Sequence, residues 1–162
     1  DVHMKEIFDC KGRITDEGYK KSGTKFLPVN SVLIALNGQG KTRGTVALLR
    51  TIATCNQSVV SIYPKDLKQL DPEYLYEILD ARYQEIRKIT GATGNDRRGL
   101  NMPLIRKIHI YIPSLLEQKQ VVKELKELRQ NLKDLSIVYQ RKMGDLEALK
   151  ESYLEEAFSG KL

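Results

Sequence analysis

The stretch from Ser114 to Phe158 constrains the fold most, because its composition is typical of one long helix. It contains no proline and a single glycine, Gly144, and it is rich in Leu, Glu, Lys and Gln, which lose little freedom in a helix. Ser114 followed by Glu117 predicts a capping box at the start, and Gly160 predicts the end. Its roughly 45 residues would span about 65 Å. So small a domain cannot bury a stripe of that length, so the helix needs a partner helix.

Apolar residues in this stretch alternate spacings of four and three, which is the heptad pattern of a coiled coil. Lys142 is the one position that departs from the pattern, and Met143 beside it can fill the gap. We therefore expect the helix to pair with an antiparallel copy of itself or with an equivalent helix. The residues of this heptad stripe are Val121, Leu125, Leu128, Leu132, Leu135, Tyr139, Leu146, Leu149 and Tyr153.

The net charge of +6 lies entirely before the long helix. Residues 115–162 carry nine basic and nine acidic side chains, whereas residues 1–114 carry 18 basic and 12 acidic ones. A basic globular part predicts a polyanion as its partner, and a neutral helical arm predicts a protein partner.

Other compositional features narrow the class of protein. Cys10 and Cys55 lack the spacing of metal ligands, and His3 and His109 stand alone, so we expect no metal site. No apolar run is long enough to cross a bilayer, so we expect no membrane partner. A reduced, cytoplasmic protein is the simplest interpretation.

Three runs of strand length predict a sheet in the first part of the chain. They lie at residues 31–36, 45–50 and 58–63, and each is apolar and partly β-branched. Residues 15–19 could form one helical turn. We also expect a half-buried strand over residues 105–112, because apolar and polar residues alternate there.

A helix is predicted between the third and fourth of these strands. Asp71 is a suitable N-cap, and Pro72 a suitable first residue. The helix should continue to Ile89 and end at Gly91. The fold class is therefore α+β, with a small β-rich domain over residues 1–113 and a long helix over residues 114–162. The predicted buried face of the shorter helix consists of Leu75, Ile78, Leu79, Arg82, Ile86 and Ile89.

The glycine-rich segment after the first strand resembles a nucleotide-binding P-loop at first sight. The first glycine of that motif would fall at Ala35, however, and a P-loop must open a helix. Gly44 and the β-branched residues after it favour a strand instead. Such a hairpin loop either has no function or places Lys41, Thr42 and Arg43 against DNA phosphates and base edges.

Two further pairs of polar residues are candidates for DNA contact. Asn56 and Gln57 can pair with adenine, although a role in bonding nearby backbone is favoured. Arg97 and Arg98 are adjacent guanidinium groups in a second glycine-rich loop, where they either bind DNA or are simply solvated. We find no serine–histidine pair, no paired carboxylates and no Asn/Asp-Pro-Pro-Tyr motif for amino methylation. The sequence therefore predicts neither a catalytic centre nor a cofactor.

With these residues in view, the chain resembles the specificity subunit of type I restriction–modification systems. The most specific combination is the helix start at Ile112, Pro113 and Glu117–Gln118 together with the helix end at residues 157–160. The stretches that carry the resemblance are Ile14–Tyr19, Leu33–Gly44, Ala53–Gln57, Gly99–Asn101, Ile110–Gln118 and Glu156–Leu162.

This resemblance implies a DNA-reading module without catalysis of its own. In that family two recognition domains each read half of a bipartite target, and two antiparallel helices set their separation and dock methyltransferase and restriction subunits. This chain has one such domain and one helix, and it starts after the family's usual N-terminal strand segment. We therefore expect a half-subunit that forms a homodimer or pairs with a second half-subunit, or else a fragment that lacks the N-terminal part of the recognition domain.

Other functions remain open from the sequence. Within DNA recognition, the alternative is the specificity domain of a single-chain restriction–methylation enzyme. From other classes come a P-loop nucleotide-binding protein and a coiled-coil scaffold without a DNA role. A helix after Thr42 would favour the nucleotide-binding protein, and the absence of salt-dependent DNA affinity would favour the scaffold.

Overall fold

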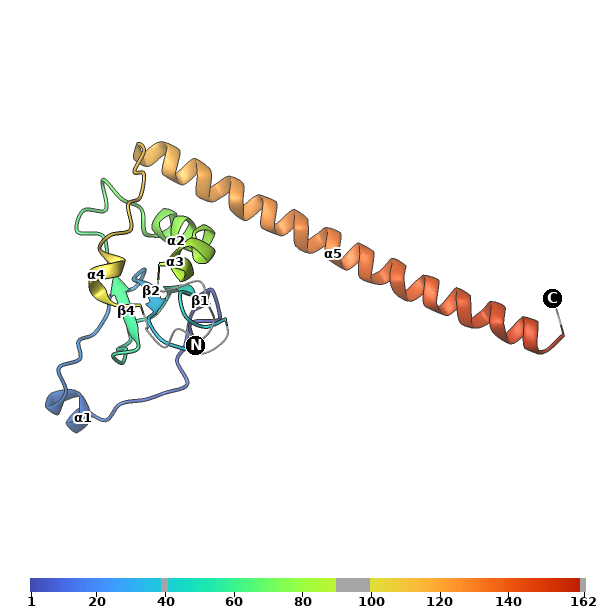
Figure 1. The fold of residues 1–162 in the computed structure, drawn as a ribbon, viewed down its shortest axis with the longest axis horizontal. Helices are drawn as coiled ribbons and strands as arrows, with labels where there is room; N and C mark the ends of the chain where they lie inside the picture. The colour runs from blue at the N-terminus through green and yellow to red at the C-terminus, as the bar shows by residue number, and fades with distance from the viewer. Residues whose placement is uncertain (39–40, 90–99, 161–162) are drawn as a thin grey trace. The chain divides into compact units, whose positions relative to one another are not determined.

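Among the residues that the structure describes, four strands form one mixed sheet in the order β1-β3-β2-β4. The strands β1, β2 and β4 are labelled in Figure 1. The computed structural model describes residues 1–38, 41–89 and 100–160. In chain order the strands are β1 (Glu6–Ile7), β2 (Val32–Ala35), β3 (Val46–Leu49) and β4 (Val59–Ile62). β2 is antiparallel to both of its neighbours, whereas β1 is parallel to β3. β2, β3 and β4 confirm the three strands predicted from composition, and β1 was not predicted.

The sheet is buried on both faces, which explains the continuous apolar sequence of its central strands. All four residues of β2 and all four of β3 are buried. Val32, Ile34, Val46 and Leu48 belong to the larger cluster, which is completed by residues of the helices. The other face is covered by a smaller cluster around Ile7, Leu33, Ala47 and Leu49. Strands buried on both faces carry apolar runs rather than alternating patterns.

The predicted helix after Asp71 is present but broken into two. Asp71 caps α2 (Pro72–Ala81) by accepting from the backbone N–H groups of Glu73 and Tyr74 at 2.7 and 3.2 Å. A second helix, α3 (Tyr83–Lys88), follows after a break at Arg82, where φ is −91° and ψ is 13°. Expecting one continuous helix was therefore wrong.

Tertiary contacts at the break explain why the helix does not continue. The Arg82 guanidinium donates to the carbonyl of His109 and also pairs with Glu85. Of the predicted buried face, Leu75, Leu79 and Ile86 are buried, whereas Ile78 and Arg82 are half-buried and Ile89 is exposed. The long-range contact between Arg82 and the His109 carbonyl outweighs the local preference for one continuous helix.

The predicted strand over residues 105–112 does not form. A short helix, α4 (Met102–Ile105), is capped by Asn101, and the chain then continues without a strand partner as far as Ser114. Backbone carbonyls in this segment accept from side chains instead. Tyr74 Oη donates to the carbonyl of Tyr111 at 3.2 Å, and Arg82 donates to that of His109. The alternation was real in part, because Ile108 and Ile110 pack on the core while Ile112 is exposed.

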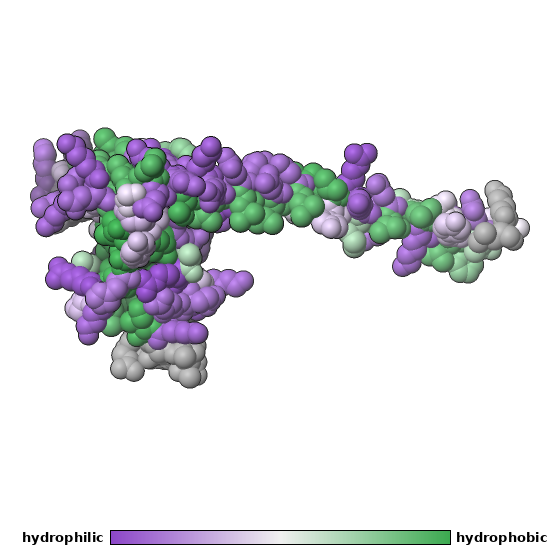
Figure 2. All heavy atoms as spheres, turned by 90° about the horizontal axis from the view of Figure 1, so that it is seen from above, coloured by the Kyte–Doolittle hydropathy of each residue, from purple (hydrophilic) through white to green (hydrophobic). Residues whose placement is uncertain are grey.

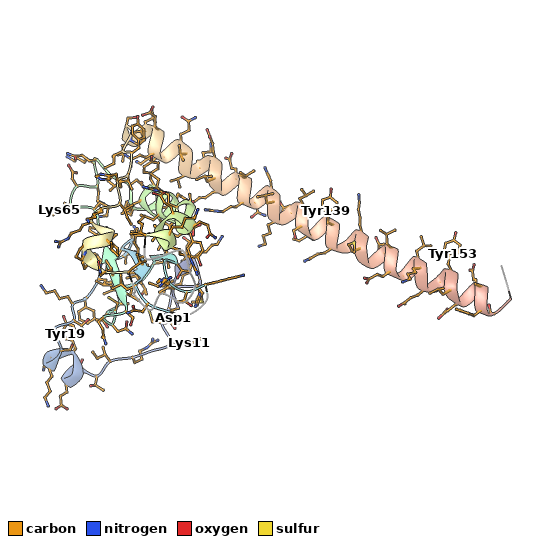
Figure 3. The ribbon with its side chains drawn as sticks, viewed as in Figure 1. Asp1, Lys11, Tyr19, Lys65, Tyr139 and Tyr153 are labelled. Carbon is orange, nitrogen blue, oxygen red and sulfur yellow. The ribbon has the colours of Figure 1, made fainter. Side chains whose placement is uncertain are left out.

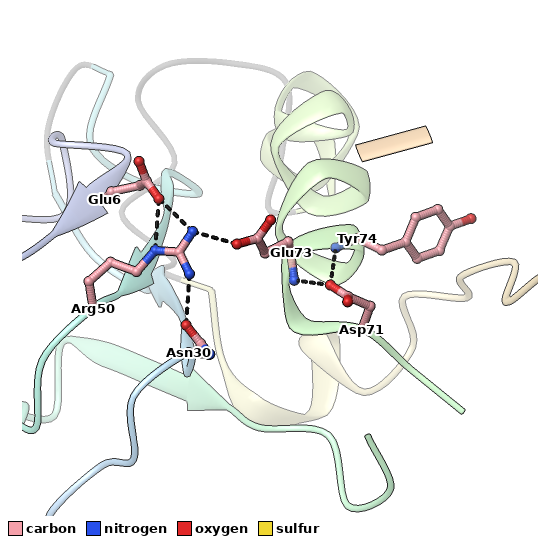
Figure 4. A network of polar contacts seen from close by, with 6 residues as sticks. All are labelled: Glu6, Asn30, Arg50, Asp71, Glu73 and Tyr74. Atoms are coloured by element: carbon pink, nitrogen blue, oxygen red, sulfur yellow. Dashed lines mark hydrogen bonds and ion pairs between the residues drawn. The ribbon is translucent and has the colours of Figure 1, made fainter. Parts of the chain in front are cut away.

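Arg50, just after β3, ties three parts of the domain together (Figure 4). Its guanidinium lies 2.6 Å from carboxylate oxygens of both Glu6 in β1 and Glu73 in α2. It also donates to Asn30 Oδ1 at 2.8 Å. The Arg50 side chain is 18% exposed and that of Glu73 28%, so their ion pair is partly shielded from water, whereas Glu6 is 44% exposed. Arg50 therefore fastens the short edge strand β1 to the rest of the sheet.

The long helix α5 (Leu115–Phe158) is continuous over 44 residues. At its start, Ser114 N donates to Glu117 Oε2 at 2.9 Å, and Glu117 N donates to Ser114 Oγ at 3.4 Å, which confirms the capping box. Ser114 Oγ also donates to Glu117 Oε2 at 2.6 Å, and this bond together with the one from Ser114 N lowers the pKa of the Glu117 carboxyl. Gly160 follows with a φ of +70°. α1 (Asp16–Lys21), capped by Thr15, likewise confirms the predicted helical turn.

The chain divides into two compact units, Asp1–Val122 and Lys123–Leu162. The first turns of α5 belong to the globular unit, since Gln118 and Val122 are buried there. The second unit consists of the remainder of α5 and the residues that follow it. Within the described part of the chain, no helix combines the length and the apolar character that crossing a bilayer requires.

Candidate nucleic-acid interface

A tight turn, Lys41–Gly44, precedes β3 at one end of the sheet. Thr45 N donates to the carbonyl of Thr42 at 3.0 Å, and Gly44 N donates to that of Ala35 at 2.9 Å. The first of these bonds closes a β-turn over residues 42–45, in which Gly44 is the third residue, and its φ of +83° has the sign that a type II turn requires there. Strand β3 begins two residues later, so this segment does not open a helix. The P-loop geometry is therefore excluded.

The glycine before this turn allows a close approach of the chain to itself. Gly38 has a φ of +132°, and a Cβ atom added there would lie 2.6 Å from Cβ of Thr42. No other residue fits this position without displacement. Gly38 therefore lets the chain pass close to Thr42, whereas the expected close approach of the glycine-rich loop to DNA remains a prediction.

The three candidate residues of the Lys41–Gly44 turn differ in exposure. Lys41 is exposed, whereas Thr42 and Arg43 are half-buried. An exposed lysine can follow a phosphate oxygen, while a partly packed arginine presents its donors in a more fixed direction. Their role in DNA contact remains a prediction.

Helix α3 packs directly on this turn, which the sequence did not reveal. A Cβ atom on Gly44 would lie 3.4 Å from Cγ of Arg87 and 3.8 Å from Cδ2 of Tyr83. Tyr83 Oη donates to the carbonyl of Lys41 at 2.6 Å, and Arg87 Nη1 donates to Tyr83 Oη at 2.5 Å. Tyr83 and Arg87 are four residues apart and therefore lie on one helix face. This spacing was the only sequence signal that their side chains are in contact.

Asn56 and Gln57 lie at the same end of the sheet as the Lys41–Gly44 turn. The connection is β2, since Ala35 pairs with Val59 and Leu36 N donates to the carbonyl of Ser58 at 2.8 Å. Asn56 Oδ1 accepts from Ser58 N at 3.0 Å, which is the backbone role favoured from sequence. Both amide side chains are exposed. Arg97 and Arg98 lie outside the described residues.

Gln118 at the base of α5 belongs to the motif that carries the resemblance, but the burial of its polar side chain was not predicted from the sequence. Its side-chain amide is fully buried and makes three hydrogen bonds. Oε1 accepts from Asp71 N at 2.9 Å, and Nε2 donates to the carbonyls of Gln69 and Pro113, both at 2.8 Å. These contacts join the start of α5 to the start of α2.

The heptad stripe of α5 is exposed, as its predicted pairing role requires. Leu125 is half-buried, and the other stripe residues range from 40% exposed at Val121 to 61% at Leu146. In Figure 2 apolar side chains gather along one side of this helix, and Figure 3 marks Tyr139 and Tyr153 on it. Pairing through the stripe remains a prediction.

Metal and thiol chemistry find no support in the part of the chain that the structure describes. It contains no cluster of three or more His, Cys, Asp or Glu side chains that could hold a metal. Cys10 and Cys55 are half-buried, free thiols. Burial raises the pKa of the Cys55 thiol, which makes it less reactive.

The described residues thus form a small α+β domain with a cationic turn at one end of its sheet, followed by a long helix with an exposed heptad stripe. Residues 4–136 match the family model described as type I restriction modification DNA specificity domain. The chain belongs to this family, which confirms the resemblance seen in the sequence.

Individual relatives support this assignment. The EcoR124I/EcoR124II specificity subunit of Escherichia coli is 26% identical over 113 residues, which cover 69% of this chain and 28% of that protein. The solved HsdS subunit of Thermoanaerobacter tengcongensis has a TM-score of 0.59 at 19% identity, over 85% of this chain and 31% of that one.

A second solved structure, concerned with complex assembly and conformational transition of the type I R-M system, gives a TM-score of 0.61 at 22% identity. It matches 85% of this chain and 33% of its own. The α+β fold class is thereby confirmed. This chain spans about a third or less of the length of these relatives.

Proposed function

We propose that this chain reads one half of a bipartite DNA target as the specificity component of a type I restriction–modification system. The observation that carries the proposal is the Lys41–Gly44 turn, which presents Lys41, Thr42 and Arg43 at one end of the sheet. The basic charge of residues 1–114 supports a polyanion as the ligand. Membership of the specificity family makes double-stranded DNA the polyanion of choice.

The residues of the interface would divide the work of recognition. Lys41 is assigned to phosphate contact, because a mobile, exposed ammonium group positions DNA without reading sequence. Arg43 is assigned to base reading, since a guanidinium can donate two hydrogen bonds to guanine. Asn56 and Gln57, at the same end of the sheet, are candidates for further contacts, and Arg97 and Arg98 remain candidates from the sequence.

The proposed partners follow from the two units of the chain. The domain would bind DNA in the cytoplasm, and α5 would pair with an antiparallel copy or with the helix of a second half-subunit. The assembly would then dock the methyltransferase and restriction subunits. We propose that this chain itself is not catalytic and binds no cofactor. The recognition domain of a single-chain restriction–methylation enzyme is the alternative that uses the same interface.

The test is to reassemble the complete enzyme with Lys41→Ala or Arg43→Ala and to measure methylation across a randomised half-site library. Lys41→Ala should slow all targets alike and reduce the slope of the salt dependence by about one. Arg43→Ala should broaden one position of one half-site, at a cost of about 1–3 kcal/mol there. Lys65→Ala is the matched control, because this exposed lysine lies beyond the opposite end of β4.

Unchanged rates and unchanged specificity for both variants would remove this turn from the interface. The absence of any salt-dependent DNA binding by the wild-type assembly would favour a scaffold function instead. Calorimetry with ATP on the same chains checks the assumption that the protein is not a nucleotide-binding enzyme. Saturable binding that Lys41→Ala abolishes would contradict it.

A further inference from the structure

We propose that Tyr83 and Arg87 on α3 position the Lys41–Gly44 turn, and that discrimination between DNA sequences depends on this pair. The inference rests on the proposed function, because it concerns how the same turn reads DNA. Neither residue is expected to touch a base itself. We call the two residues the Tyr83–Arg87 clamp.

The clamp holds the backbone of the turn rather than a side chain. Tyr83 Oη donates to the carbonyl of Lys41 at 2.6 Å, so it fixes the peptide group that joins Lys41 to Thr42. This contact links residues 42 positions apart in sequence. The far side of the turn is held separately by Gly44 N, which donates to the carbonyl of Ala35. The Lys41–Gly44 turn is therefore held at both ends.

Arg87 determines how the tyrosine hydroxyl can be used. A hydroxyl has one proton to donate and two lone pairs that accept. Because Arg87 Nη1 donates to Tyr83 Oη at 2.5 Å, the hydroxyl accepts from Arg87 and is left to donate its proton to the backbone carbonyl of Lys41. The Arg87 guanidinium also lies 5.3 Å from the centroid of the Tyr83 ring, a favourable cation–π distance. Arg87 thus holds the phenol in the orientation that the turn needs.

Packing adds a further restraint on the turn. Side-chain atoms of Ile86, Arg87 and Tyr83 lie between 3.4 and 3.8 Å from where a Cβ of Gly44 would be. Ile86 is itself 1% exposed and belongs to the main core. Helix α3, which carries the clamp, is therefore anchored in the core through Ile86, and its contacts restrain the Lys41–Gly44 turn.

Base reading needs this rigidity more than phosphate binding does. The attraction between a lysine and a phosphate falls slowly with distance, so a loosened turn keeps most of it. A bidentate arginine–guanine contact weakens steeply when donor angles or distances depart from their optimum. Loss of the clamp should consequently reduce discrimination between sequences much more than it reduces affinity for DNA in general.

The first experiment measures the clamp without DNA, by amide hydrogen exchange on the full chain. Tyr83→Phe removes the hydroxyl and keeps the ring. Exchange at Gly44 and Thr45 should quicken by roughly two- to tenfold, the equivalent of one lost hydrogen bond. Tyr63→Phe is the matched control, because Tyr63 is an exposed tyrosine beyond the opposite end of β4. Exchange that is unchanged in Tyr83→Phe would overturn the clamp.

The second experiment measures discrimination by the assembled enzyme on a randomised half-site library. Tyr83→Phe and Arg87→Lys should each lower the ratio between preferred and average sites by roughly two- to tenfold, with less than a twofold change on unselected DNA. Arg87→Lys keeps the charge, so its effect would come from positioning. An equal loss on every sequence, or an unchanged ratio, would overturn the inference. A wild-type enzyme without sequence preference would instead refute the proposed function, while hydrogen exchange would still test the clamp.

Discussion

Gly38 shows how a single residue sets the shape of the candidate interface. Alanine there would combine a positive φ with a contact of 2.6 Å to Thr42, so the turn must move to accept it. We expect Gly38→Ala to lower the free energy of unfolding by about 1–3 kcal/mol. Denaturant unfolding followed by circular dichroism measures this change. Gly12→Ala is the control, because a Cβ at Gly12 meets nothing within 4 Å.

An unchanged midpoint for Gly38→Ala would mean that the turn adapts without cost.

The sequence did predict a glycine-rich loop at this place, because a glycine-rich segment between two strand patterns is a local signal. It did not predict the buried contacts of Gln118 or the role of Tyr83. These contacts are made with partners that are distant along the chain. Residue roles that depend on long-range partners were beyond local pattern analysis.

The same distinction applies to whole elements. β2, β3, β4 and α5 were predictable, because hydrophobic runs, turn glycines and a capping box act over a few neighbouring residues. The break at Arg82 was not, because it depends on contacts with His109 and on the packing of α3 against Gly44. Residues 105–112 have the alternation of a strand but lack a strand partner. β1 is two residues long, too short to form a recognisable pattern.

Helix α5 is the element that most clearly needs a partner helix, because its heptad stripe is exposed in the single chain. We expect the wild-type chain to associate through its stripe, and Leu128→Asp combined with Leu135→Asp to give monomers, because charges are not tolerated in such a seam. Sedimentation velocity at tens of micromolar, roughly where weak association appears, measures this. Both leucines are at least 50% exposed in the single chain.

The control is a variant with Gln130 and Gln140 both changed to Asp, which adds the same charge off the stripe. It should associate as the wild type does. If the wild-type chain is monomeric under these conditions, the pairing hypothesis fails for the chain by itself. Equal loss of association in both double variants would indicate a general effect of charge.

At the scale of the whole molecule, the two units differ in what stabilises them. The globular unit has a core on both faces of its sheet, and Arg50 links β1, β3 and α2 within it. The second unit consists mainly of one helix, whose large apolar side chains are exposed apart from the half-buried Leu125. A lone helix gains little from backbone hydrogen bonds and propensity, and most helical stability in proteins comes from tertiary packing. The first unit is therefore expected to be the more stable of the two.

The pairing of β1 also has a consequence for the order of folding. β2 and β3 can meet early, since a short loop joins them, whereas β1 must close a long loop to pair in parallel with β3. Pulse-labelled exchange during refolding should show Leu49 N, which bonds Ser31, protected before Arg50 N, which bonds Ile7. Simultaneous protection of both amides would contradict this order. In the expected order, the strand that comes first along the sequence is the last to join the sheet, and Arg50 completes its attachment.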